Sequence, residues 1–371
     1  MSVQQGWVAF AALVGADLVL RLLVHVYYAD GERVLRILRL RPRRLEQREH
    51  YYQPLDAWLA PLPCIWTWFD IVAAALLAAL LDNALGWLAL VIWSGGRFRA
   101  LQEFGHNAVH FALCRSHDWQ WCLADFFYQF PAFKRDMHNR HIAHTLEHHR
   151  HPNHESKDPN RTRVYNGGMA YPLNSPQFYW RTLYPLSWAG LRTNLVTMAR
   201  NSMLNHHYLT VLVRIVSLAA VGAVLYWAAG WRGVVCGWCL PLLSTYPLFA
   251  WWSLLTEHRW FVSGDSTSRR ELECLMGRPT DYVGVRGWLV RVFICPTSDA
   301  YHLVHSLYPA VRWNYLPALD RHFKIEDPLY TAHASQGLLF SRDGIPSALS
   351  ELRQRLTAVP PSQADLQSQG R

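Results

Sequence analysis

The chain has 371 residues, of which 51% are hydrophobic and only 17% are charged. Apolar stretches and polar segments interleave along its length, so no linker divides it, and one membrane-embedded domain over residues 1–359 is the simplest organisation. The formal charge of +9 would suit nucleic acid binding, but base-reading motifs are missing and arginines concentrate beside apolar stretches. The seven scattered cysteines show no disulfide spacing, which argues against a stapled secreted fold.

The first apolar stretch covers residues 7–28 and is interrupted by Asp17, Arg21 and His25. No small-residue cleavage site follows it, so it predicts a first membrane span or an interfacial helix rather than a secretory signal peptide. The segment 30–50 then carries seven arginines. Short arginine-rich loops stay on the cytoplasmic side of a membrane, which sets the expected orientation of the rest of the chain.

Two transmembrane hairpins are predicted after this loop. Their apolar runs lie near residues 64–81, 84–100, 208–227 and 234–255. The runs are long enough to cross about 30 Å of hydrocarbon, and the connections within each pair are short. If both hairpins begin and end in the cytoplasm, the polar segments form a cap on that side. The fold class is therefore an all-α integral-membrane helical bundle with a cytoplasmic His-rich helical cap, followed by a disordered tail at 360–371.

Histidines dominate the polar segments, since ten of the 19 lie between His106 and His154. His106 and His110 are four residues apart, which places both rings on one face of a helix. The same spacing separates His144 from His148, whereas the adjacent His149 points to another side of that helix and is free to serve a second metal. Three more candidates come from distant parts of the chain: His258, His302 and His305.

A single histidine is more often a surface or capping residue than a metal ligand. Here four separate histidine clusters are expected on the same, cytoplasmic side of the membrane, which favours metal binding over the surface role. A site rich in imidazole, with no cysteine thiolate nearby, suits iron, zinc, copper or nickel, and the spacing does not choose among them. The residues by themselves therefore predict one or two transition-metal ions.

The histidine pattern resembles that of the membrane fatty acid desaturases, whose boxes are HxxxH, then H with two or three residues before HH, then HxxHH. His106 and His110 match the first box. The second box, in its three-residue-spacer form, corresponds to His144, His148 and His149. The family also has an isolated Glu-His pair after the second hairpin, which corresponds here to Glu257-His258. The third box corresponds to His302 and His305, with the trailing Leu-Tyr-Pro. The resemblance covers roughly residues 59–319 and implies two iron ions held by these eight histidines, with dioxygen as co-substrate.

The third box departs from the family pattern, because Ser306 stands where the family has a second histidine. Serine is a poor iron ligand. We hypothesise that Asp299 compensates, binding iron directly or through water. His141 and His151 lie outside the family positions and are expected to support the site or to make up the deficit.

The resemblance implies an oxygen-dependent desaturase acting on a fatty acyl chain or related lipid, with its active site on the cytoplasmic side of the membrane. No dinucleotide, haem or iron–sulfur motif is present, so electrons are expected from an external ferredoxin-, rubredoxin- or cytochrome-type donor. A hydroxylase or ketolase acting on a carotenoid, alkane or specialised lipid is the nearest alternative. A non-catalytic metal-binding membrane protein is another.

Overall fold

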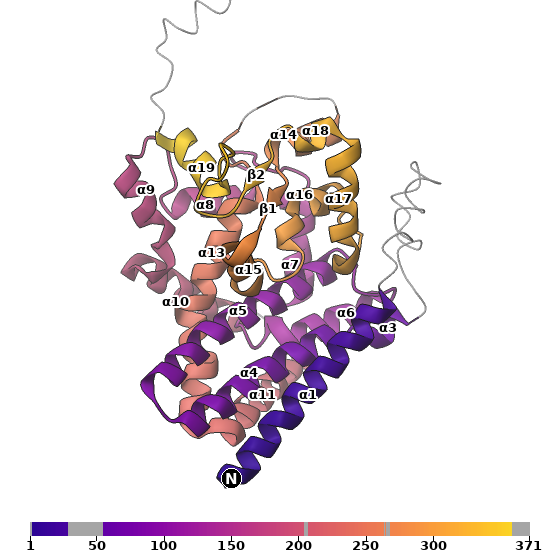
Figure 1. Cartoon of the computed structure of the whole chain (residues 1–371), viewed down its shortest axis with the longest axis vertical. Helices are drawn as coiled ribbons and strands as arrows, with labels where there is room; N and C mark the ends of the chain where they lie inside the picture. The colour runs from indigo at the N-terminus through magenta and orange to yellow at the C-terminus, as the bar shows by residue number, and fades with distance from the viewer. Residues whose placement is uncertain (1, 29–54, 204–206, 263, 265–267, 358–371) are drawn as a thin grey trace, which may run out of the picture.

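The computed structural model describes residues 2–28, 55–203, 207–262, 264 and 268–357 (Figure 1). These residues are mostly helical, as expected. In the described ranges the strands are β1 (Thr280–Asp281) and β2 (Ser335–Gln336), which form one short parallel pair. The arginine-rich segment 30–50 and the tail at 360–371 lie outside the described residues.

The N-terminal half contains α1 Val3–Tyr27, α3 Asp56–Leu59, α4 Leu62–Leu81, α5 Ala84–Val109, α6 His117–Ala124, η3 Asp125–Gln129, α7 Met137–His141, η4 Ile142–His148, α8 Pro159–Asn166, α9 Ser175–Thr182, η5 Tyr184–Leu186 and α10 Trp188–Met203. The C-terminal half contains α11 Tyr208–Val234, η6 Val235–Cys239, α12 Leu240–Leu243, α13 Thr245–Glu257, α14 Arg269–Met276, α15 Gly284–Phe293, η7 Asp299–Tyr301, α16 His302–Leu307, η8 Trp313–Tyr315, α17 Leu316–Glu326, α18 Pro328–Thr331 and α19 Ala348–Thr357.

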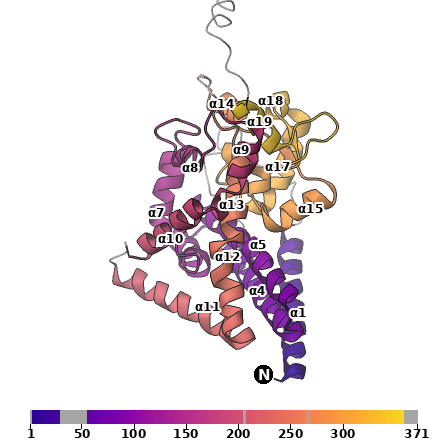
Figure 2. The same cartoon turned by 90° about the vertical axis from the view of Figure 1, so that its left-hand side faces the viewer.

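The long helices α1, α4, α5 and α11 fill the lower part of Figure 1, and the short helices gather above them. Helix α4 ends at Asp82, whose φ of 36° reverses the chain, and the Asn83 side chain caps the start of α5. Helix α11 kinks at Gly230, whose φ is 59°. Arg232 forms an ion pair with Asp82, so the two reversals lie side by side. From there α12 and α13 rise into the short helices (Figure 2).

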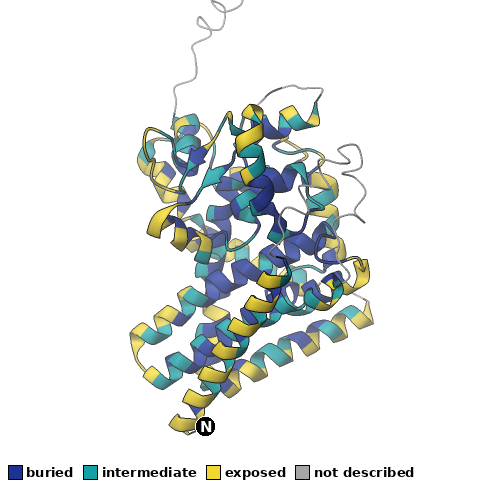
Figure 3. Ribbon diagram, turned by 45° about the vertical axis from the view of Figure 1, so that its right-hand side comes forward, coloured by how far each residue is buried: buried dark blue, intermediate teal, exposed yellow. Residues whose placement is uncertain are grey.

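Three stretches of the described residues are long and apolar enough to cross a membrane: Val3–Tyr27, Asp56–Leu81 and Tyr208–Glu257. Helix α5 falls outside this group because Arg97 and Arg99 interrupt its apolar sequence. Many apolar side chains on α1 are exposed (Figure 3), including Val8 at 65% and Leu18 at 60%. A continuous exposed apolar surface of this kind suits contact with lipid.

The charged residues that interrupt the long helices pair with one another. The Arg21 guanidinium donates to Asp17 at 2.8 Å and to Asp70 at 2.8 Å, and Arg97 donates to Asp70 at 3.1 Å. Ionisable groups in an apolar surrounding need such partners. The interruptions seen in the sequence therefore join α1, α4 and α5 instead of breaking them.

Close packing in the middle of α5 fixes the position of its histidine-bearing end. A Cβ atom on Gly95 would lie 2.2 Å from the Thr245 hydroxyl oxygen of α13, and one on Gly96 would lie 2.8 Å from the Phe293 ring of α15. Only glycine permits both approaches. The largest buried apolar cluster continues from this crossing to α16 and α17, through residues such as Phe104 and Leu319.

Candidate metal centre

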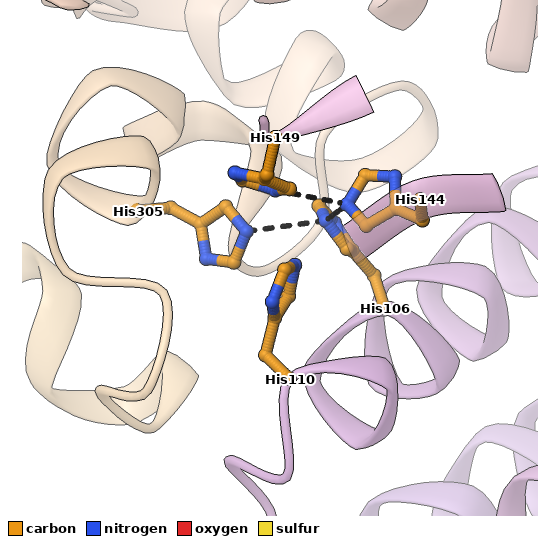
Figure 4. A group of neighbouring side chains, drawn as sticks. All are labelled: His106, His110, His144, His149 and His305. Carbon is orange, nitrogen blue, oxygen red and sulfur yellow. Dashed lines mark hydrogen bonds between the residues drawn. The ribbon is translucent and has the colours of Figure 1, made fainter. Parts of the chain in front are cut away.

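Five imidazoles meet at one point in the structure (Figure 4), and we call them the five-histidine group: His106, His110, His144, His149 and His305. The first two lie at the end of α5, the next two lie on and just after η4, and the last is on α16. All their ligand nitrogens lie within 4.8 Å of one another. Residues almost 200 positions apart in the chain thus share one buried site.

The nitrogen spacings match those of donors around a metal ion. His106 Nε2 lies 2.7 Å from His144 Nε2 and 3.1 Å from His305 Nε2. Two nitrogens that each bind one ion at about 2.1 Å, at right angles, are about 3 Å apart. The buried Nε2 atom of His110 has no hydrogen-bond partner among the described residues, which is the state expected of a nitrogen kept for a metal.

A second cluster, the three-histidine group, consists of His148, His258 and His302. His258 Nε2 lies 3.2 Å from His148 Nε2 and 3.1 Å from His302 Nε2. The two groups are neighbours, since the ring centroids of His148 and His149 are 5.3 Å apart. All eight histidines selected from the sequence therefore lie in one of two adjacent clusters.

The second histidine box lies in and just after a π-helix, and its three histidines are not grouped as an α-helix would group them. Residues Ile142–His148 form a π-helix, and the His149 amide donates to the His144 carbonyl at 3.0 Å. In this wider turn, residues five apart lie above one another. His144 is therefore grouped with His149, and His148 faces the other cluster. The expectation that His144 and His148 would share a face, with His149 pointing away, was wrong.

Asp299 supports the five-histidine group from behind. Its Oδ1 lies 3.3 Å from His106 Nδ1, while Oδ2 accepts from Arg99 at 2.6 Å and from Ser253 at 3.1 Å. Because these contacts engage both oxygens, Asp299 orients the ring of His106 and does not stand among the ligand nitrogens. The geometry therefore agrees with a supporting role for Asp299 and not with the compensation that was hypothesised from the sequence.

A buried network holds Asp299 in this position. The Glu103 carboxylate accepts from the Asp299 amide at 3.2 Å, from the Thr297 amide at 2.7 Å and from Arg99 at 3.2 Å. These bonds join α5 to the turn that precedes α16. The first and third histidine boxes are thereby tied together before any metal binds.

Asp158 plays the same part for the three-histidine group. Its carboxylate lies 2.8 Å from His148 Nδ1 and accepts from the Asn153 amide at 2.7 Å. It also caps α8 by accepting from the Asn160 amide. No role was predicted for Asp158 from the sequence. The Asp158-Pro159 pair is nevertheless a recognisable helix start, and it follows His148 by ten residues.

The other two histidines named from the sequence belong to neither group. His141 Nδ1 lies 2.8 Å from the Val109 carbonyl, so its ring supports the end of α5. The ring of His151 lies 6.0 Å from that of His154, away from the eight. Neither histidine makes up a ligand deficit in this arrangement.

Ser306, the residue that departs from the family pattern in the third box, lies on the same helix as His302 of the three-histidine group. Ser306 follows His302 by one helical turn, is buried, and its hydroxyl has no hydrogen-bond partner in the described part of the chain. Helix α14, which packs against α16, carries the buried Glu273, whose charge interacts with that of His148. Burial raises the pKa of Glu273 to about 7, although the charges of Arg269 and His148 act to lower it. Sequence reasoning did not identify Glu273.

Comparison with known proteins agrees with this geometry. The fatty acid desaturase family matches residues 85–336, which is more than half of the chain and includes all eight histidines. This chain belongs to the fatty acid desaturase family. It is 25% identical to the dihydrorhizobitoxine desaturase of Bradyrhizobium elkanii over 314 residues, covering 77% of this chain and 82% of that protein. No solved structure matches it significantly. Membership and this relative support a desaturase-type oxidoreductase.

The protonation states in this desaturase favour metal binding. Burial, reinforced by the neighbouring imidazoles, lowers the pKa of His110, His149 and His302 well below the ordinary value. Neutral imidazole is the form that binds metals. Burial alone would also lower the pKa of His148, but its hydrogen bond and charge interaction with Asp158 outweigh burial and raise it. The three-histidine group thus contains one ring that holds its proton more tightly.

Proposed function

We propose that this protein is an oxygen-dependent, non-haem di-iron desaturase embedded in a membrane. The observation that carries the proposal is that eight histidines, most of them buried, form two adjacent groups of five and three. Neighbouring nitrogens in these groups are about 3 Å apart, which is the spacing of donors around a metal ion. Histidine suits several metals, and membership of the desaturase family supports iron as the metal proposed. The residues present fit two ions, one in each group.

When bound, an iron pair supplies the activation of dioxygen and the oxidation of an unactivated C–H bond. The chain contributes the rest. The eight imidazoles hold the metals, while Asp299 and Asp158 keep two of the rings in orientation. Burial of the histidines limits access of bulk water to the reacting atoms.

Desaturation removes two hydrogens from neighbouring carbons, and two further electrons and two protons complete the reduction of dioxygen to two waters. These electrons come from an external ferredoxin-, rubredoxin- or cytochrome-type donor in this proposal. The long apolar helices lie in the bilayer, and the histidines lie at its cytoplasmic face. The arginine-rich segment 30–50 supports that orientation.

Hydroxylation by the same superfamily shares the first hydrogen abstraction. The printed activity of the Bradyrhizobium relative favours desaturation over hydroxylation. Turnover under ¹⁸O-labelled dioxygen separates the two reactions, because a hydroxylated product carries the label and a desaturated product does not.

The test of the proposal is metal content and Mössbauer spectroscopy of the full chain, purified in detergent from cells grown on iron-57. Two coupled irons per chain are expected. One zinc ion, or no metal, would overturn the proposal and favour a non-catalytic metal-binding protein.

A further inference from the structure

A cavity of about 290 Å³ opens onto the five-histidine group. His106 and His144 form part of its wall, together with Asp299. Its remaining walls come from α5, η3, the loop before α7, α7, η4, α8, α10 and α13. The volume is at the small end of the range for small-molecule sites. A substrate in this cavity would lie directly against the imidazoles.

The lining of this cavity is polar. Four basic side chains face it, and five Asn and Gln side chains accompany them. The basic residues are Lys134, Arg135, Arg140 and Arg163. The aliphatic lining is limited to Ala143, Pro159, Ala250 and Leu254. A hydrocarbon chain would leave the polar groups here without partners, at a cost for each one.

In the described ranges of the chain, none of Lys134, Arg140 and Arg163 forms a close ion pair with a carboxylate. Two carboxylates, those of Glu257 and Asp299, also line the cavity, and the charge of Arg163 acts on that of Glu257. Arg140 instead contacts neutral groups, the Gln129 side chain at 3.4 Å and the Gln102 carbonyl at 3.3 Å. Burial lowers the pKa of Lys134 to about 7, and the charges of Arg163 and Arg140 lower it further in the same direction. An anion placed among these groups would relieve their mutual repulsion.

Two largely apolar cavities among the described residues lie elsewhere. One of about 740 Å³ is lined by Phe249, Trp252 and the region of α15, and one of about 430 Å³ lies between α1, α4 and α11. Among the described residues, none of the eight histidines lines either cavity. Helix α13 separates the first of them from the polar cavity, to which it presents Ala250, Leu254 and Glu257. The larger apolar cavity and the histidines are therefore on different sides of this helix.

We propose that the substrate is a small, water-soluble carboxylate, bound by Lys134, Arg140 and Arg163 with its reacting carbons against the five-histidine group. This inference rests on the proposed function and names its substrate class, in place of the long acyl chain that the resemblance implied. Arginine and lysine recognise carboxylates through charge-assisted hydrogen bonds. Glu257, also in the wall, accepts a hydrogen bond from a hydroxyl or ammonium group at the other end of the molecule.

The experiment measures binding of ¹⁴C-hexanoate to the iron-loaded full chain in nanodiscs, with hexanamide and octadecanoate as competitors. Hexanamide lacks the charge, and octadecanoate carries the same carboxylate on a long chain. The variants are Arg140→Gln, Lys134→Met and the control Arg192→Gln, which removes an exposed arginine on α10 that lies outside this cavity. Iron content is measured on each preparation, so that loss of the fold is distinguished from loss of the carboxylate site.

We expect saturable hexanoate binding that weakens at least about tenfold in Arg140→Gln and Lys134→Met, with both irons retained, and is unchanged in Arg192→Gln. Hexanamide should not compete, and octadecanoate should compete no better than unlabelled hexanoate. The inference is overturned if the iron-loaded protein does not bind hexanoate, if affinity rises with chain length, or if removal of the basic side chains leaves binding unchanged. Absence of iron from the wild-type protein would instead contradict the proposed function.

Discussion

The two histidine groups differ in how many ligands they offer and in what supports them. The five-histidine group has rings from all three boxes, and Asp299 supports it from within a buried network of arginine and glutamate. The three-histidine group has one ring from the second box, one from the third and His258. Its supporting carboxylate, Asp158, belongs to the start of a helix. Ser306, which stands where the family pattern has a histidine, lies one helical turn from His302, a member of the three-histidine group. We therefore expect the missing ligand to affect the three-histidine group.

This difference indicates that the two metals would be held with different strength. A group of five fills all but one position of a six-coordinate ion, whereas a group of three leaves half of the positions open. Open positions are where a catalytic metal takes up its co-substrate. The four predictions that follow test whether this asymmetry exists in the protein.

The largest effect is expected from His258→Ala. It leaves the three-histidine group with two rings, so iron should fall from about two ions per chain to about one, and activity should be lost. His149→Ala, which leaves four rings in the other group, should retain both irons with weaker binding. Metal analysis by mass spectrometry checks both variants. Equal iron loss in the two would show that the groups are held alike.

The supporting carboxylates come next. Asp158→Asn should weaken iron binding at the three-histidine group by about 10–100-fold, because the ring of His148 loses the acceptor that orients it. Asp299→Asn should have a smaller effect, since its contact with His106 is longer, at 3.3 Å against 2.8 Å, and four other imidazoles of the group still hold the ion. Iron release to a chelator, followed over time, measures both. A larger effect of Asp299→Asn would reverse the proposed order.

Ser306→His should restore the family pattern and add a ring one helical turn from His302. We expect about tenfold slower iron loss from the three-histidine group in the same chelator assay. Ser306→Ala is the matched control and should behave as the wild type, because the hydroxyl makes no hydrogen bond within the described residues. No change in Ser306→His would place this side chain away from the metal.

Acidification should also distinguish the two groups, because we expect them to lose iron at different pH values. This effect should be smaller than those of the substitutions. The pKa of His148 is raised, so iron must displace a proton there, and affinity should fall by up to about tenfold per pH unit below that pKa. The five-histidine group, whose rings have lowered pKa values, should keep its iron to lower pH. Mössbauer spectra between about pH 8 and about pH 5 follow each site. Asp158→Asn should make the iron affinity of this group depend less steeply on pH, and an unchanged pH dependence would contradict the assignment.

The sequence by itself determined the helical class, the long apolar runs and the eight histidines. Hydrophobic length is a local property, and helical spacing alone brings His106 and His110 together. The sequence also placed the anomaly at Ser306. These inferences need no knowledge of distant contacts, because each depends on residues within a turn or two of one another.

Only the tertiary structure decided how the histidines divide. A π-helical turn cannot be recognised from the spacing of His144 and His148, and it moves His149 into the five-histidine group. The role of Asp299 depends on contacts with α5, almost 200 positions earlier in the chain. The role of Asp158 depends on how the loop after η4 folds back on His148. The same holds for the polar cavity, where the loop before α7 and the end of α13 bring Lys134 and Glu257 together in one lining. Long-range packing sets these positions, and no local pattern in the sequence encodes them.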